Sequence, residues 1–124
     1  MLDHVSIGVR DTAKSRPFYD AVFAAIGATP LDTGDGYAGY GRGEAQFWIQ
    51  DSRHPVPADM RSGLHFCFTA DSRAAVDAFY AAALAQGGTD NGAPGLRPDY
   101  GPDYYAAFVL CPDGYRIETH THQE

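Results

Sequence analysis

The stretch CPDGYRIETH, residues 111–120, places three polar side chains where they could do metal or acid–base chemistry. Its Pro-Asp-Gly sequence predicts a tight turn at 112–114, and the residues after the turn alternate as in a β-strand. One face of that strand is apolar, and the other carries Arg116, Glu118 and His120. A solvated sheet face accounts for such a strand as readily as a functional site does. Its meaning therefore depends on whether other strands aim similar groups at the same place.

Two histidines occupy matching places in two similar segments. His4 lies in LDHVSIGV, residues 2–9, and His65 lies in GLHFCFTA, residues 63–70. Each is expected near the centre of a strand, on the face away from the apolar row that packs on a helix. A single histidine on a strand is more often a core residue than a ligand. Two at equivalent positions, together with Glu118 on a later strand, favour a metal site.

The elements that must position these residues occur twice along the chain. In the first half, the opening strand is followed by a helix over 11–26, which Asp11 or Thr12 can cap and Gly27 ends. Glycine-punctuated extended segments follow at about 28–33, 37–41 and 45–50. This half is predicted to be β-α-β-β-β.

The second half repeats that order. Residues 71–88 predict a second capped helix that ends in a Gly-Gly pair, and the Gly- and Pro-rich residues 91–103 predict a long loop. Strands are expected at 104–110 and 115–120, on either side of the tight turn. Both halves therefore predict the same unit, and the chain is expected to be an α+β protein.

One domain is expected from the length of 124 residues, which is enough to bury a core without disulfides. The predicted domain spans 1–124. Within it, module one covers about 1–52, a Pro-containing linker about 53–61, and module two about 62–124. If the modules pair by pseudo-two-fold symmetry, both imidazoles point into one shared concavity.

These segments resemble the vicinal oxygen chelate superfamily, which includes glyoxalase I, bleomycin-resistance proteins, fosfomycin-resistance thiol transferases and extradiol dioxygenases. The resemblance covers essentially the whole chain and rests on LDHVSIGVRDTAKSRPFYDAVFAAIG, LHFCFTA and YYAAFVLCPDGYRIE. In that family two βαβββ modules form a cupped mixed sheet with helices on its outer face, and the cup holds a divalent metal. Residue by residue, the resemblance implies the metal ligands His4, His65 and Glu118.

The implied set of two imidazoles and one carboxylate suits Fe, Mn, Ni, Co or Zn and leaves coordination positions open. An open site lets the ion act as a Lewis acid toward vicinal oxygens. The glyoxalase I pattern adds a fourth ligand at about position 48, where this chain has Trp48. Glu44 is the nearest acidic residue and is expected in the preceding turn. Glyoxalase I activity is therefore not favoured.

Two other branches match three ligands better. Extradiol dioxygenases use two histidines and one carboxylate on iron, but their usual chain has twice as many modules. Fosfomycin-type thiol transferases are about this size and place a hydroxyl two residues after the first histidine, as Ser6 would. A phosphonate pocket is not favoured, because only Arg97 and Arg116 are plausible cations in the cup.

The predicted catalytic residues are Glu118, Tyr104 and Tyr105, with a tyrosine hydroxyl as acid or hydrogen-bond donor. The two tyrosines face opposite ways on one strand, and the sequence does not say which face lines the cup. The side chains predicted to contact substrate are Ser6, Trp48, Cys67, Tyr100, Phe108 and Arg116. Core packing explains the aromatic ones equally well; as functional residues they indicate a ring-bearing ligand.

Two residues near the predicted site have simpler interpretations. Cys67 could line the cup, but an inert small hydrophobe is favoured. His120 could reach the site from the face of Glu118, but a solvated C-terminal end is favoured.

The composition excludes several classes of partner. A formal net charge of −7 argues against nucleic acid and anionic membranes, which require a basic face. No apolar run approaches the roughly 20 residues of a membrane span. The first ten residues do not read as a signal peptide, so the two cysteines are expected to be reduced thiols in a cytoplasmic protein.

The leading hypothesis is a metal-dependent lyase, isomerase or dioxygenase that acts on a small oxygen-bearing molecule. The alternative is a resistance-type protein that sequesters a small molecule without catalysis, although such members of the family typically lack the ligand set. A ligand-sensing or structural module is a third possibility, for which the sequence shows no extra domain. Family members of this size commonly dimerise, sometimes sharing ligands between chains, and a homodimer is expected.

Overall fold

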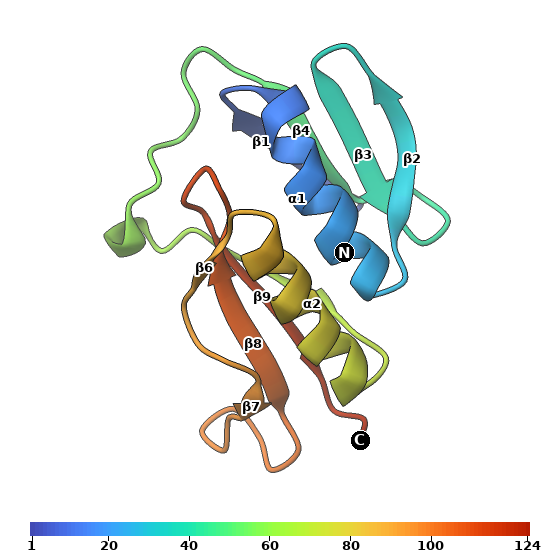
Figure 1. The fold of residues 1–124 in the computed structure, drawn as a ribbon, viewed down its shortest axis with the longest axis vertical. Coiled ribbons are helices and arrows are strands. Elements are labelled where there is room, and N and C mark those ends of the chain that lie inside the picture. The colour runs from blue at the N-terminus through green and yellow to red at the C-terminus, as the bar shows by residue number, and fades with distance from the viewer.

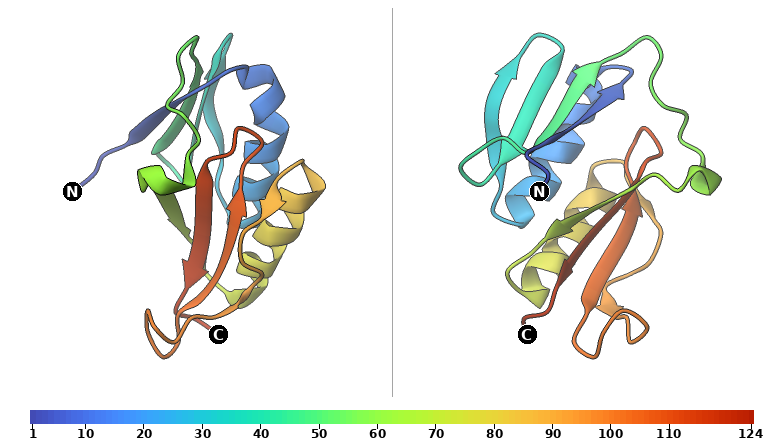
Figure 2. Two further views of the ribbon diagram at one scale, coloured as in Figure 1. Left: turned by 90° about the vertical axis from the view of Figure 1, so that its left-hand side faces the viewer. Right: turned by 180° about the vertical axis from the view of Figure 1, so that it is seen from behind.

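Two helices lie side by side and cover one side of two β-sheets in the computed structural model, which describes residues 1–124 (Figure 1). Figure 2 shows the other side of both sheets left open. Neither helix is long and apolar enough to cross a membrane. The two modules therefore stand edge to edge, with their helices on a shared face.

Module one contains one helix and a four-stranded sheet. Its elements are β1 (Val5–Val9), α1 (Thr12–Ala25), β2 (Thr29–Gly34), β3 (Tyr37–Gly41) and β4 (Phe47–Asp51). The strand order is β1-β4-β3-β2, with β1 parallel to β4 and the other pairs antiparallel. One long edge of β1 is therefore free.

Module two repeats this plan after a linker that includes a short 3-10 helix, Met60–Ser62. Its elements are β5 (His65–Thr69), α2 (Arg73–Ala85), β6 (Thr89–Asp90), β7 (Gly95–Leu96), β8 (Tyr105–Leu110) and β9 (Arg116–Thr121). The order is β5-β9-β8-β6, and β7 also pairs with β8. The predicted α+β class and βαβββ repeat are confirmed, while the loop predicted at 91–103 contains the short strand β7.

Helix starts and strand faces follow the sequence pattern. The side chain of Asp11 accepts a hydrogen bond from the Ala13 N–H at the start of α1, and Ser72 caps α2 through the Ala75 N–H. Every second strand residue, such as Ile117 and Ile49, is buried against the helices. The residues between them lie on the open face of each sheet.

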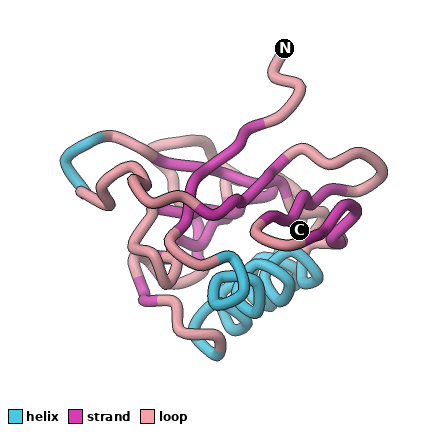
Figure 3. The backbone as a smooth tube through the Cα atoms, turned by 90° about the horizontal axis from the view of Figure 1, so that it is seen from above, coloured by secondary structure: helices cyan, strands magenta, loops and turns pink.

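The prediction that both histidines are central in their strands was wrong. β1 begins at Val5, one residue after His4, because the Val5 N–H makes the first bridging hydrogen bond, to the carbonyl of Gln46. Residues 1–4 extend beyond that partner strand and leave the body of the fold (Figure 3). His65 is the first residue of β5.

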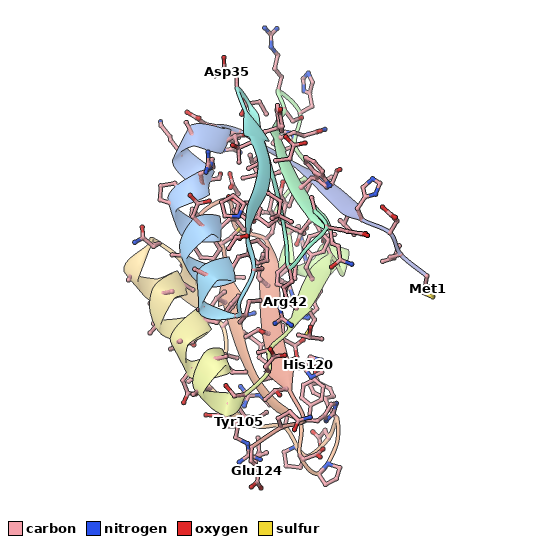
Figure 4. All side chains as sticks on the ribbon, turned by 90° about the vertical axis from the view of Figure 1, so that its right-hand side faces the viewer. Met1, Asp35, Arg42, Tyr105, His120 and Glu124 are labelled. Carbon is pink, nitrogen blue, oxygen red and sulfur yellow. The ribbon has the colours of Figure 1, made fainter.

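Arg42, just after β3, connects the two modules. Its Nε and Nη2 donate to the carbonyl of Ile26 at 3.1 and 2.6 Å, and Nη2 also reaches the carbonyl of Thr69 in module two at 3.0 Å. Nη1 lies 3.3 Å from Oδ1 of Asp71. Figure 4 shows Arg42 at the junction of the modules. One guanidinium thus joins the end of α1 to the end of β5.

Arg42→Ala is expected to lower the free energy of unfolding by roughly 1–3 kcal/mol, because two carbonyls lose a charged donor. Arg42→Lys should restore only part of this, since an ammonium cannot reproduce the planar fork. Denaturant unfolding measures both. The control is Arg61→Ala, whose side chain is 90% exposed and pairs only with Asp59. Equal unfolding midpoints for the Arg42→Ala and Arg61→Ala variants would contradict the connecting role.

Candidate functional site

Glu118 is the centre of a polar cluster on the open face of module two. Its side chain is only 6% exposed, and its Oε1 lies 2.7 Å from Nε2 of His65. The hydroxyl of Tyr104 donates to the other oxygen, Oε2, at 2.6 Å. The second ring nitrogen of His65, Nδ1, is buried without a partner. The proton of the neutral imidazole is therefore favoured on Nε2, where Glu118 accepts it.

Strand register explains why these side chains converge. Glu118 of β9 lies opposite Phe108 of β8 and opposite Cys67 of β5, so all three share one face. The Phe108 ring centroid is 6.0 Å from that of His65. Arg116 is the cross-strand neighbour of His65 on the same face, and its Nη1 donates to the Met60 carbonyl at 3.4 Å. The predicted contacts Cys67, Phe108 and Arg116 thus surround the cluster.

The structure separates the two candidate tyrosines. Tyr104 lies with Glu118 on the open face, but Tyr105 lies on the helix face of the sheet. There its hydroxyl donates to Asp77 of α2 at 2.7 Å, and the Arg73 guanidinium lies 5.1 Å from its ring centroid. Tyr105, predicted to be catalytic, is therefore not brought to the cluster.

His120 is part of the cluster rather than a solvated end. Strand β9 extends to Thr121, and the His120 ring stacks on Tyr104 with centroids 4.4 Å apart and planes 5° apart. Burial lowers the pKa of His120 below its ordinary value and so favours the neutral form of the ring. The favoured sequence interpretation was wrong because His120 is held between two neighbouring strands, opposite Thr69 of β5 and Ala106 of β8.

Tyr100 and Cys67 lie at the solvent-exposed edge of the cluster. Tyr100 packs edge-on against Tyr104 at 5.3 Å but is 65% exposed. The pKa of the Cys67 thiol is raised to about 12, mainly because neighbouring side chains remove water from the sulfur and secondly because the Glu118 carboxylate is near. Part of the residue nevertheless remains open to solvent. A thiol that stays protonated at neutral pH is a poor nucleophile, in agreement with the inert interpretation.

The open face of module one carries Ser6 and Trp48. Trp48 lies opposite Ser6 in the β1–β4 pair, as Glu118 lies opposite Cys67 in the β5–β9 pair. Trp48 therefore occupies the place in module one that Glu118 occupies in module two. Its ring covers Gly39, where an added Cβ would come within 2.6 Å of it. The ring thus lies flat on the sheet and is half-buried.

His4 does not join His65 and Glu118 within one chain. Its imidazole is 54% exposed, and Nδ1 lies 2.6 Å from Oδ1 of Asp3. Both histidines border a cavity of about 490 Å³ between the free edges of β1 and β5, but no three metal-ligating side chains of the chain gather closely enough to hold an ion. The chain brings together two of the three predicted ligands.

This fold and this face can be compared with those of known proteins. A family model described as Glyoxalase/Bleomycin resistance protein/Dioxygenase superfamily matches residues 1–119. The chain belongs to this superfamily. A search of curated proteins gave no match. The sequence resemblance to the vicinal oxygen chelate family is thereby confirmed.

Solved structures of the superfamily have the same fold over nearly the whole chain. A glyoxalase/bleomycin resistance protein from Albidiferax ferrireducens T118 is 32% identical, with a TM-score of 0.81 and 95% of each chain covered. A family enzyme from Burkholderia phytofirmans PsJN is 21% identical, with a TM-score of 0.71 over 96% of each chain. FosX, a fosfomycin resistance protein from Listeria monocytogenes, is 18% identical, with a TM-score of 0.70 over 97% of this chain and 91% of its own. The last two likenesses show the fold alone.

Sequence reasoning missed the packing of aromatic rings onto glycines in module one. A Cβ at Gly34 would lie 2.5 Å from the Tyr37 ring, and the Tyr37 and Trp48 rings are 6.4 Å apart. The run of glycines in β2 and β3 read as turn signals. Gly34 pairs with Tyr37 and Gly39 pairs with Trp48 across neighbouring strands, so the register of the sheet brings each ring over its glycine.

Proposed function

We propose that this protein is a divalent-metal-dependent enzyme of lyase, isomerase or dioxygenase type that acts on a small oxygen-bearing molecule. The observation that supports this most is the convergence of His65 Nε2 and Glu118 Oε1 at 2.7 Å on an open sheet face. Imidazole and carboxylate are suitable donors for Fe, Mn, Ni, Co or Zn. A divalent ion would compete with the shared proton for these two atoms.

The third ligand in this proposal is His4 of the partner subunit in a homodimer. Within one chain His4 is exposed and apart from Glu118, and the N-terminal residues leave the fold (Figure 2). The open face of module two holds His65 and Glu118, and the open face of module one holds Ser6 and Trp48. Opposing these two faces across a two-fold axis would assemble both halves of the predicted site twice.

The residues of this chain have distinct roles in the proposed site. The bound ion would supply Lewis-acid activation of the substrate oxygens. In the metal-free chain Glu118 is held between two hydrogen-bond donors, and the Tyr104 hydroxyl would still hold Oε2 when an ion replaces the proton shared with His65. Phe108 on the open face of module two and Trp48 on the opposing face of module one supply apolar surface for a ring-bearing molecule, and Arg116 supplies positive charge beside His65.

The test is the metal content of protein purified without chelator or affinity tag, followed by reconstitution with each candidate ion. We expect about one ion per chain, and its identity directs the assay: iron toward dioxygenation, nickel or zinc toward isomerase or lyase chemistry, and manganese toward thiol transfer. Protein that takes up none of these ions would instead be a binding protein that uses the same faces to sequester a small molecule. FosX, an 18% identical neighbour, is a fosfomycin resistance protein, so fosfomycin is a further compound to test for binding.

Trp48 offers a direct measure of ring binding because it is the only tryptophan of the chain. In metal-free protein, catechol is expected to bind roughly 2–10-fold more tightly than cyclohexane-1,2-diol, since aromatic pairs contribute about 0.5–1.5 kcal/mol beyond area burial. Binding of catechol should also change the Trp48 fluorescence. Trp48→Leu should remove the preference, as measured by calorimetry. Equal affinity of the wild-type protein for both diols would contradict a ring-binding role for Trp48.

A further inference from the structure

The two oxygens of the Glu118 carboxylate have different partners. Oε1 lies against Nε2 of His65, and Oε2 accepts a hydrogen bond from the Tyr104 hydroxyl at 2.6 Å. Glu118 is almost fully buried, so solvent cannot easily replace either partner. The carboxylate is therefore fixed in rotation about its last bond, with one oxygen committed to each neighbour.

The Tyr104 ring is itself held in place by three other rings. The His120 imidazole stacks on it at 4.4 Å, while Tyr100 and His122 meet it edge-on at 5.3 and 5.4 Å. His122 is in turn 3.1 Å from Oδ1 of Asp103 through its Nδ1. His120 near the end of β9 and His122 just after it thus fix the ring of a residue that precedes β8. Such a stack restricts the hydroxyl to one position.

We propose that Tyr104 is a positioning residue that holds Oε2 of Glu118 and leaves Oε1 as the single oxygen available beside His65. This rests on the proposed metal-dependent function. A carboxylate with both oxygens free can chelate an ion through both, whereas one with an oxygen already hydrogen-bonded binds through the other. One-oxygen binding leaves an additional coordination position for substrate. The ring of His120 acts through Tyr104 by holding its hydroxyl in place.

The alternative role for Tyr104 is direct proton donation to substrate. A phenol has one proton to donate, and the structure directs that proton to Glu118. To serve as an acid, Tyr104 would have to rotate its O–H away from Glu118 and give up the 2.6 Å hydrogen bond to the carboxylate. The geometry therefore favours support of the carboxylate over proton transfer.

Tyr104→Phe is the decisive variant, because it removes the hydroxyl and keeps the ring. We expect the dissociation constant for Co²⁺ to rise roughly 10–100-fold, as when a hydrogen-bond partner of a metal ligand is removed. The matched control is Tyr105→Phe, the same change one residue later on the other face, which should leave the constant unchanged. His120→Phe keeps a stacking ring and should behave like wild type, and His120→Ala should fall between wild type and Tyr104→Phe.

A second measurement needs no metal. Glutamate occurs only at Glu44, Glu118 and Glu124, so a protein labelled with ¹³C at the glutamate carboxyl gives few signals, and Glu118→Gln assigns the one of interest. In metal-free protein, Tyr104→Phe is expected to shift the Glu118 signal, and Tyr105→Phe is not. A purely structural loss would instead change the thermal midpoint without this selective shift.

The outcomes separate the two proposals. If the wild-type protein binds no metal, the proposed function fails, and the carboxyl signal alone decides whether Tyr104 positions Glu118. If Tyr104→Phe alters neither the Glu118 signal nor the Co²⁺ constant, the positioning role is overturned. If Tyr104→Phe does not fold, His120→Ala provides the same comparison against His120→Phe. Equal results for those two would overturn the proposal.

Discussion

His65→Ala is expected to reduce the metal content of the protein from about one ion per chain to background, because it removes an imidazole donor from the proposed site. The loss should exceed the roughly 10–100-fold weakening that follows removal of a residue that only supports a ligand. Glu118→Gln should also weaken binding, since a neutral amide is a poorer donor than a carboxylate. The change is nearly isosteric, so the fold should persist. Elemental analysis and titration with Co²⁺ measure both effects.

The control for these variants is His54→Ala, the same substitution at an exposed linker position that borders neither cluster nor cavity. It should leave the metal content unchanged. Thermal unfolding of the metal-free variants then separates ligand loss from structural damage. Full retention of metal in His65→Ala would rule out the proposed ligand. If Glu118→Gln unfolds without any difference in metal affinity, the role of Glu118 is structural.

Mixing two inactive variants is expected to restore metal binding if His4 serves the partner subunit. A homodimer of either His4→Ala or His65→Ala should contain no complete site, because one histidine is missing from each of its two sites. In the mixed dimer, His4 of the partner subunit faces an intact His65 and Glu118 at one of the two sites. Random exchange of subunits should therefore recover about one ion per four chains.

This complementation distinguishes a shared site from one within a single chain. If His4 completed the site of its own chain, every site in the mixture would still lack one histidine, and no metal would return. The same two variants, refolded separately and then combined without subunit exchange, provide the baseline. A sedimentation measurement on each variant checks that the dimer forms. Monomeric wild-type protein would contradict the proposed homodimer directly.

The sequence by itself determined the βαβββ repeat and the sheet face on which most strand side chains lie. Strand residues alternate with period two, so Glu118 is necessarily on the face opposite Ile117, and Trp48 on the face opposite Ile49. Both assignments needed only the apolar row. Counting along the last strand of each module gave position 48 as the equivalent of Glu118. The strand registers agree, because Trp48 and Glu118 occupy corresponding places in the two modules. Asp11 was among the predicted helix caps because a carboxylate before an apolar repeat satisfies free N–H groups.

Only the tertiary structure decided which residues meet. Tyr104 and Tyr105 are equally good candidates in sequence. The pairing of β8 with β9 places Tyr104 beside Glu118, whereas Tyr105 donates a hydrogen bond to Asp77 of α2. The stack of His120 on Tyr104 and the contacts of Arg42 between modules depend on segments far apart in the chain. His4 stays apart from Glu118 because β1 begins only where Gln46 can accept its first hydrogen bond. Local patterns set the face of a side chain, but pairing between distant strands sets its neighbours.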